Sequence, residues 1–447
     1  MPARLRRVCA SGYGVVRTPA SLRQTGGVLT WEAPRATRPV HATVPLPGSK
    51  SLTNRLLLLA ALADGPSRLV APLRARDTLL MAGALRSLGV DVADDGVHWI
   101  ITPNQLHGGH VDTGLAGTVM RFVPPLAGLA DGSVTFDGDD YARERPMATL
   151  LDGLRQAGIE VADGGRGKLP FAVHGRGSVP GGSVHIDASA SSQFVSGLML
   201  AGARYDKGIE IVHTGASTVP SQPHIEMTLQ VLRTTGVEAE SVRPNIWRVA
   251  PGPISVGTQV VEPDLSNAAP FLAAAVVTGG TVRIPGWPDS TTQAGDALRA
   301  LLTEMGAGVQ RDEDGLTVTG TGSITGLVAD LRDVGELTPV LAAIAALANS
   351  DSSFYGIGHL RGHETDRLAA LCTELTRLGC TVVEQSDGLT ISPRPLRAGV
   401  WHSYADHRMA TAGAVLGLAV DGIEVDDIAC TTKTLPDFPG MWSALLR

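Results

Sequence analysis

One pattern of apolar and polar residues recurs six times along the chain. Each copy begins with a polar loop, continues as an apolar segment rich in Ala, Leu and Val, and reaches a Gly-containing turn before residues of alternating polarity. An apolar surface on all sides predicts a buried helix, and the alternation predicts a strand. The copies recur about every 70 residues, and such self-similarity outweighs the assignment of any single segment. They start at Leu46, Gly114, Ser189, Glu262, Val334 and Tyr404.

A second kind of helix lies between these copies. Its apolar residues recur at three- and four-residue spacing, and a Gly residue closes it before the next strand. Such segments occupy 78–94, 147–163, 225–240, 297–315 and 367–388. The two patterns predict an α/β protein with buried helices inside and amphipathic helices outside. Because six buried helices do not fit one core, we expect two lobes of three units, joined near the Gly- and Pro-containing stretch 257–263.

Composition narrows the classes of function. The 447 residues carry a net charge of −7 and include 4% aromatic residues, so neither a basic field nor a stacking surface for nucleic acid is expected. The four cysteines have no zinc spacing, and no apolar run reaches the roughly 18 residues of a membrane span. We therefore expect a cytoplasmic protein without metal, nucleic-acid or membrane partners. Residues 1–27 contain five Arg and no acid, and we expect them to lie outside the fold.

The start of the first buried helix has the chemistry of an anion site. Pro45–Arg55 reads PLPGSKSLTNR, so Gly48 turns the chain and Ser51 or Thr53 can cap the helix. Unpaired N–H groups, hydroxyls and two cations then meet at one helix start. The spacing differs from that of a nucleotide-binding P-loop.

All six buried helices start with polar residues of this kind. Capping accounts for the Ser, Thr, Asp and Asn residues among them, but not for Lys50, Gln193, His407 or Arg408. If the helices of each lobe are parallel, their N-terminal ends gather at a cleft between the lobes that suits a small polyanion. The residues at these starts are Ser49, Lys50, Ser51, Arg55, Gly117, Thr118, Arg121, Ser191, Ser192, Gln193, Asp264, Ser266, Asn267, Glu336, Thr338, Asp406, His407 and Arg408.

Several motifs carry a family resemblance. PLPGSKSLTNR, GLAGTVMRF, RERPM, DASASSQF, HETDRL, YADHRMA and TTKTLPDF occur in this order, and together they resemble the bacterial 5-enolpyruvylshikimate-3-phosphate synthases over residues 45–439. The resemblance implies a two-lobed inside-out α/β barrel with three βαβαββ repeats in each lobe. It also implies that 47–262 form one lobe and that 28–46 with 263–447 form the other. The implied reaction transfers the enolpyruvyl group of phosphoenolpyruvate to the 5-hydroxyl of shikimate 3-phosphate and releases phosphate.

The resemblance implies two sets of ligand-binding residues and no cofactor. Two phosphates and two carboxylates bring roughly five to six negative charges, which need about as many cations in one closed cleft. Phosphoenolpyruvate is expected to contact Lys50, Gly117, Arg145, Gln193, Arg367, Arg408 and Lys433. Shikimate 3-phosphate is expected to contact Lys50, Ser51, Arg55, Ser191, Ser192, Gln193, Ser221, Glu336 and His363.

Two acids and two lysines are the expected catalytic groups. Glu336 is expected to take the proton of the 5-hydroxyl, because it lies at a buried helix start. Glu364 is expected to handle the methyl proton, although a carboxylate among many cations favours its ionised form and so suits a base better than an acid. Lys50 and Lys433 are expected to assist proton transfer and to stabilise leaving-group charge.

The chain departs from the common family pattern at four positions. Glu336 stands where Asp is usual, His363 where Lys is usual, His224 where Tyr is usual, and Leu115 where Asn is usual. The longer acid keeps the base, whereas His363 makes one expected cation dependent on pH. The roles of His224 and His359 stay open.

Other functions fit parts of the pattern less well. A UDP-N-acetylglucosamine enolpyruvyl transferase would need a cysteine in the loop before Arg145, which reads DGDDYARERP. A non-catalytic anion-binding module would omit Glu336 and Glu364 from a cationic cleft, and an RNA-processing relative would need a basic surface. We therefore expect a monomeric transferase of aromatic amino acid biosynthesis that acts on small molecules and is inhibited by glyphosate.

Overall fold

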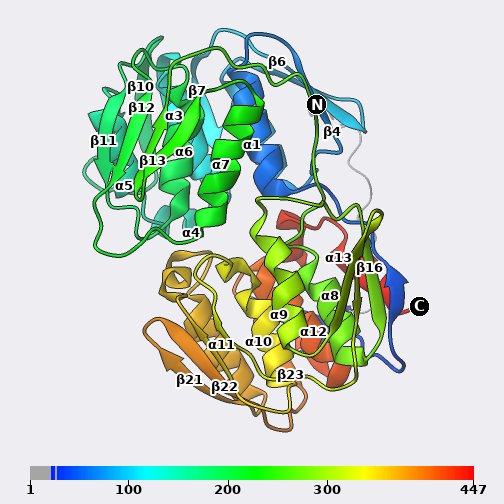
Figure 1. Ribbon diagram of the computed structural model, residues 1–447. Helices are drawn as coiled ribbons and strands as arrows, with labels where there is room; N and C mark the ends of the chain where they lie inside the picture. Colours follow the sequence, from blue (N-terminus) through cyan, green and yellow to red (C-terminus); the bar gives the residue numbers. More distant parts are fainter. Residues whose placement is uncertain (1–21, 26–27) are drawn as a thin grey trace, which may run out of the picture.

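The computed structural model describes residues 22–25 and 28–447, which form two lobes (Figure 1). The hydrophobic core of lobe 1 consists of residues between Leu56 and Val261. The core of lobe 2 combines residues between 31 and 44 with residues between 265 and 445. Each core encloses three helices that lie beneath three small sheets.

All six sheets share one four-stranded topology, in which a parallel pair is extended by two antiparallel strands. The first sheet of lobe 1 has the strand order β15 (Thr258–Val260), β4 (Ser67–Val70), β6 (His98–Thr102) and β5 (Asp91–Asp94). The second has the order β7 (His107–Asp112), β8 (Asp131–Asp137), β10 (Phe171–Arg176) and β9 (Glu160–Ala162). The third has the order β11 (Gly182–Ile186), β12 (Ile209–His213), β14 (Ile246–Val249) and β13 (Ala239–Arg243). The predicted repeat is therefore a real structural unit.

Lobe 2 repeats this arrangement three more times. Its first sheet has the strand order β3 (His41–Thr43), β16 (Thr281–Pro285), β18 (Gly315–Thr319) and β17 (Gly308–Asp312). The second has the order β19 (Val328–Asp330), β20 (Ser352–Tyr355), β22 (Gly388–Ser392) and β21 (Thr381–Gln385). The third has the order β23 (Gly399–Trp401), β24 (Ile423–Val425), β2 (Val28–Glu32) and β1 (Leu22–Thr25). The predicted two-lobed α/β fold is confirmed.

The helices divide into an inner and an outer set, as their apolar patterns predict. The inner helices are α1 (Lys50–Ala61), α3 (Gly117–Ala127), α6 (Ser192–Gly202), α8 (Ala269–Thr278), α10 (Thr338–Ala346) and α12 (His407–Ala419). The outer helices are α2 (Arg76–Ser87), α5 (Ala148–Gln156), α7 (Gln222–Thr234), α9 (Leu298–Glu304), α11 (Arg367–Arg377) and α13 (Phe438–Leu445). Short helical segments are α4 (Asp140–Glu144), η1 (Ala294–Ala297), η2 (Gly335–Leu337), η3 (Gly358–Gly362) and η4 (Ile428–Lys433).

The N-terminal end of the described chain completes the sixth sheet. Strand β1 pairs with β2, and β2 pairs with β24 near the C-terminus. Residues 22–25 were expected outside the fold, and this expectation is wrong for these four residues because they supply the outer strand of that sheet. The remainder of the predicted extension, 1–21 and 26–27, lies outside the described residues.

The chain crosses between the lobes twice, at one narrow place. Gly48 forms a bridge with Pro263, Ser49 N donates to Glu262 O at 2.7 Å, and Asp264 N donates to Pro47 O at 2.9 Å. A Cβ on Gly48 would lie 2.3 Å from the carbonyl oxygen of Ala71, so only glycine fits. The predicted hinge at 257–263 is too long, because residues 258–260 pair with β4 in lobe 1. These bonds at the crossing join residues 47–49 to residues 262–264.

Candidate active site

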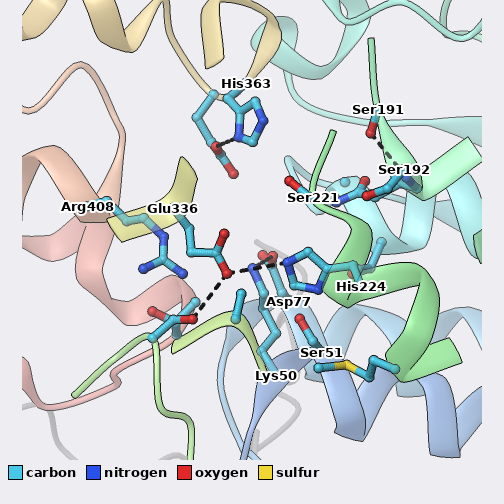
Figure 2. Close-up of a pocket in the computed structure, with 18 of the residues that line it drawn as sticks. Lys50, Ser51, Asp77, Ser191, Ser192, Ser221, His224, Glu336, His363 and Arg408 are labelled. Atoms are coloured by element: carbon cyan, nitrogen blue, oxygen red, sulfur yellow. Dashed lines mark hydrogen bonds and ion pairs between the residues drawn. The ribbon is translucent and has the colours of Figure 1, made fainter. Parts of the chain in front are cut away.

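One cavity between the lobes is lined by the starts of all six inner helices (Figure 2). Lys50, Gly117 and Ser192 come from lobe 1, while Ser266, Glu336 and His407 come from the corresponding places in lobe 2. The helix starts thus gather as the apolar pattern predicts, and their N–H groups give the cavity a positive potential.

The start of α1 is held by residues from both lobes. Ser49, rather than Ser51 or Thr53, caps the helix by accepting from Leu52 N at 3.4 Å. The hydroxyl of Thr53 instead accepts from Leu73 N at 3.1 Å, so the predicted caps are wrong. Lys50 N donates to Asp264 Oδ2 in lobe 2 at 3.0 Å, and this leaves the Ser51 hydroxyl facing the cavity.

Lys50 has an acid partner that the sequence did not indicate. Its Nζ lies 3.7 Å from Oδ2 of Asp77, a carboxylate with only 1% side-chain exposure in the first turn of α2. Burial lowers the pKa of Lys50, and the neighbouring Lys433 lowers it further, while Asp77 opposes both. A lysine with a lowered pKa gives up its proton more readily than an ordinary lysine, which fits its expected assistance in proton transfer.

Arg55 is buried but has no carboxylate partner among the described residues. Its guanidinium donates to Thr228 Oγ1 at 2.8 Å, to His224 O at 2.9 Å and to Ser51 O at 3.1 Å. Burial lowers its pKa to about 9, so it remains cationic at neutral pH. A buried cation held only by neutral groups is prepared for an anionic ligand.

Two further guanidinium groups of lobe 1 converge on Gly117. A Cβ at this position would lie 2.9 Å from Nη1 of Arg121, 3.0 Å from Nη1 of Arg145 and 3.1 Å from Oε1 of Gln193. The Nε atoms of both arginines and Oε1 of Gln193 are buried without hydrogen-bond partners. Unsatisfied donors of this kind are costly unless a ligand accepts from them. Arg121 was noted only as a helix-start residue in the sequence, yet here it lies as deep as Arg145.

The serines expected to contact shikimate 3-phosphate line one side of the cavity. Ser191 caps α6 by accepting from Gln193 N at 3.2 Å, and Ser192 follows it. Ser221 has a φ of 56°, a left-handed conformation that is unusual for a residue with a Cβ. This backbone places it at the edge of the cavity without capping α7 through its own side chain.

Two buried cations of lobe 2, Arg367 and Lys433, are already paired with acids. Arg367 is 1% exposed and forms two bonds with Asp406, Nε to Oδ2 at 2.8 Å and Nη2 to Oδ1 at 3.2 Å. Its Nη2 also lies 3.1 Å from Oε2 of Glu364, whose other oxygen bonds the ammonium of Lys433. Burial acts to raise the pKa of Glu364, but Lys433 and Arg367 outweigh it and hold that pKa well below its ordinary value.

His363 is a neutral group rather than the pH-dependent cation that the sequence suggested. Burial, followed by the nearby Arg367, lowers the pKa of His363 well below its ordinary value. Its Nδ1 lies 3.4 Å from Nη1 of Arg367 and 4.0 Å from Oε2 of Glu364. At neutral pH it can therefore offer a ring N–H or accept a bond, but it adds no charge to the cavity.

Glu336 reaches the cavity from η2, immediately before α10. Its Oε1 accepts from Ser266 Oγ at 3.2 Å and lies 3.3 Å from Nε2 of His224 in the other lobe. Burial acts to raise the pKa of Glu336, but His224 and Arg408 overcome it and the pKa lies far below the usual value. Figure 2 shows the Glu336 carboxylate between the guanidinium of Arg408 and the imidazole of His224.

The structure brings nearly all the expected site residues to this one cavity. Lys433 is the exception, since it lies behind Glu364 and lines an adjoining cavity with Arg76, Asp139 and Cys430. Lining residues that the sequence did not indicate include Asp77, Met227 and Gln293. An acid in the first turn of a helix is ordinarily explained by the helix dipole, so Asp77 had no distinguishing signal.

No helix among the described residues is long and apolar enough to cross a membrane. In the same part of the chain, no three His, Cys, Asp or Glu residues are grouped in a way that could hold a metal ion.

Comparison with known proteins decides the family. The family model described as EPSP synthase (3-phosphoshikimate 1-carboxyvinyltransferase) matches residues 34–442. The chain belongs to the EPSP synthase family. A 3-phosphoshikimate 1-carboxyvinyltransferase of Kocuria rhizophila is 56% identical to this chain over 428 residues, which cover 93% of this chain and 96% of that protein.

Solved EPSP synthase structures agree with the fold. Two structures from Acinetobacter baumannii match with TM-scores of 0.77 and 0.75, at 21% and 22% identity. Each match covers 93% of this chain and 97% of the other. The EPSP synthase resemblance, the two-lobed fold and the 3-phosphoshikimate 1-carboxyvinyltransferase activity expected from the motifs are confirmed.

Proposed function

We propose that this EPSP synthase binds phosphoenolpyruvate and shikimate 3-phosphate side by side in the cavity between its lobes. The observation that carries the proposal is a set of lobe 1 guanidinium groups that have no carboxylate partner among the described residues. Arg55 and Arg145 line the cavity at the six helix starts, and Arg121 lines an adjoining cavity together with Arg145. Anionic substrates would satisfy these groups.

Shikimate 3-phosphate is proposed to lie against lobe 1. Its phosphate would be held by the serines at the α6 start and by Ser221, and its ring would lie near Arg55 and Ser51. Phosphoenolpyruvate is proposed to lie between Lys50, Arg145, Arg367 and Arg408, with Lys433 behind it. Gly117 keeps the space beside Arg121 and Arg145 open, so glyphosate is proposed to compete there.

Glu336 is proposed as the base for the 5-hydroxyl. The low pKa of its carboxyl depends on His224 and Arg408, and a bound anion would offset part of that positive field. Substrate binding would therefore make Glu336 more basic at the moment of reaction. Glu364, which is paired with Lys433, is proposed to handle the proton at the methyl carbon. Lys50 is proposed to stabilise the charge on the phosphate as it leaves the tetrahedral intermediate.

A phosphate-release assay with both substrates tests this assignment. We expect turnover by the unmodified protein, and a loss of at least about 10²-fold in Glu336→Gln and in Lys50→Ala, the range for a group that transfers a proton or stabilises charge. Turnover of either variant at the unmodified rate would contradict the role proposed for that residue.

The two lobes are proposed to be the functional units, with boundaries at 46/47 and 262/263, and to close on the substrates. A monomer in the cytoplasm is proposed, because one chain supplies every residue that lines the cavity. Sedimentation analysis at micromolar concentration would test the monomer directly.

A further inference from the structure

The start of α7 in lobe 1 docks on the loop between β19 and η2 in lobe 2. Ser221 N donates to Arg332 O at 3.1 Å, and Nη1 of Arg332 donates to Thr218 Oγ1 at 2.9 Å. Gln222 N donates to Oδ1 of Asp333 at 3.0 Å. Since Ser221 does not cap α7 with its own hydroxyl, Asp333 caps this helix from the opposite lobe. The two lobes thus share one helix cap far from the crossing at Gly48.

This cap fixes the register of two residues that face each other. His224 follows Gln222 by two residues, and Glu336 follows Asp333 by three. Their side chains meet with 3.3 Å between Nε2 of His224 and Oε1 of Glu336, which is an ion-pair contact when the imidazole is protonated. Figure 2 shows the imidazole and the carboxylate directed toward each other across the cavity.

His224 is held firmly from its own side. Its carbonyl oxygen accepts from Nη2 of Arg55 at 2.9 Å and from the hydroxyl of Thr228 at 2.9 Å. Charged or titratable groups of lobe 2 that act on Glu336 include Arg408 on α12, Arg367 on α11 and His359 on η3. From lobe 1, Lys50 reaches toward the same carboxylate, and His224 is within ion-pair distance of it.

We propose that His224 is the positioning residue for Glu336, and that docking of α7 on the β19–η2 loop assembles the base from both lobes. This inference rests on the proposed function of Glu336. His224 and Ser266 hold Oε1, which leaves Oε2 to accept the substrate proton. In that step the 5-hydroxyl proton passes to Oε2, the hydroxyl oxygen bonds C2 of phosphoenolpyruvate, and a separate acid protonates C3. The base is thus complete only when the lobes meet.

The lengths of the two side chains are matched. Glutamate extends one methylene farther than aspartate, and a tyrosine hydroxyl extends farther from the backbone than imidazole Nε2. The pair in this chain combines the long acid with the short ring, whereas the common family pattern combines the short acid with the long ring. A change at one position should therefore open or crowd the contact, and a compensating change at the other should restore it.

The decisive experiment is a mutant cycle of Glu336→Asp, His224→Tyr and the double variant. We expect each single substitution to lower kcat about tenfold or more, with little change in the dissociation constant of shikimate 3-phosphate. The double variant should recover to within about threefold of the unmodified kcat, because residues in contact are not additive. Single losses that simply multiply in the double variant would overturn the inference.

A second cycle uses His224→Phe in the unmodified protein and in Glu336→Asp. If His224→Phe lowers kcat less in Glu336→Asp than in the unmodified protein, the result supports positioning through Glu336. This comparison holds even if tyrosine does not fit at position 224. Equal losses in both backgrounds, or no loss in either, overturn it. His224→Phe should also move the acidic limb of the kcat/KM profile to higher pH, because Glu336 loses a group that keeps its pKa low.

His98→Gln is the matched control, because His98 also pairs with a carboxylate, Asp95 at 3.0 Å, but on a surface hairpin. It should change neither kcat nor the pH profile. Absence of turnover in the unmodified protein would contradict the proposed function. Normal turnover with additive losses would contradict only the role of His224.

Discussion

The two lobes treat buried cations in opposite ways. In lobe 1, Arg55, Arg121 and Arg145 are each at most 9% exposed, and among the described residues none lies within 4 Å of a carboxylate. In lobe 2, Arg367 and Lys433 are equally buried but are neutralised by Asp406 and Glu364. Removing a charge from water is costly, so the first arrangement needs a ligand and the second does not.

This difference separates two tasks within one cavity. Lobe 2 is complete as a folded unit, and its paired charges keep Glu364 ionised and orient it. Lobe 1 keeps guanidinium groups without a carboxylate partner at the expense of stability, because a cation that no carboxylate neutralises gains more from an arriving anion. The contrast between the lobes can be tested from the largest expected effect to the smallest.

The largest effect is expected for Arg55→Met. This substitution removes the unpaired cation but keeps apolar volume, so kcat/KM for shikimate 3-phosphate should fall by about 10³-fold or more, as for the loss of two charged hydrogen bonds. The midpoint of urea unfolding should stay the same or rise, because replacing a buried charge by an apolar group is often neutral or stabilising. Arg55→Lys keeps the charge and should lose less activity. Retained substrate affinity in Arg55→Met would remove the basis for the contrast.

Asp406→Asn in lobe 2 should instead lower the stability of the fold. Arg367 loses its main partner and becomes an uncompensated buried charge, so the free energy of unfolding should fall by about 3 kcal/mol. The asparagine can still cap α12, as Asp406 does by accepting from Arg408 N at 2.9 Å. Asp437→Asn is the control, since Asp437 caps α13 and has no cation within 4 Å in the described part of the chain. A loss as small as that of the control would contradict the account.

Gly117→Ala tests the place where the unpaired groups converge. The new methyl group would press on Arg121 and Arg145 at about 3 Å, so KM for phosphoenolpyruvate should rise by about tenfold and sensitivity to glyphosate should fall. Gly83→Ala is the matched control, because nothing lies within 4 Å of its Cβ position in α2 and the substitution should stabilise by about 0.5–1 kcal/mol. Unchanged glyphosate inhibition in Gly117→Ala would argue against this placement.

The smallest effect is expected for Arg283→Ala, on the surface of lobe 2. The bond from Arg283 lowers the pKa of Asp312 from 3.8 to about 2, so this pair stabilises the fold above pH 4 and loses that effect as the pH falls toward 2. Because both groups face solvent, the unfolding midpoint at pH 7 should move only slightly. The small difference should shrink toward zero as the pH falls through 2. A loss at pH 7 as large as that of Asp406→Asn would show that pairing, rather than burial, sets the effect.

The local sequence pattern was sufficient to predict the repeated parts of the molecule. Six apolar segments with polar starts predicted six inner helices whose starts line one cavity, because helical period and capping chemistry are properties of neighbouring residues. The motifs then predicted Lys50, Arg55, Arg145 and Glu336 as residues of one cavity, and all four line it.

Contacts between distant segments could not be predicted in this way. Three such contacts are the ion pairs of Lys50 with Asp77, of Arg367 with Asp406 and of His224 with Glu336. The paired residues are 27 to 112 positions apart in the chain. The same reason explains the error at residues 22–25, whose polar, Arg-containing sequence gave no sign of a strand that completes a sheet with β24.

The use of both chain ends in lobe 2 has a consequence during synthesis. Lobe 1 is continuous and can fold as soon as β15 leaves the ribosome, but β2 must wait roughly 390 residues for β24. At about 5–20 residues per second, that delay is roughly 20–80 s. Through this interval β2 exposes an unpaired edge of the kind that nucleates aggregation, and β3 does so until its partner β16 is made.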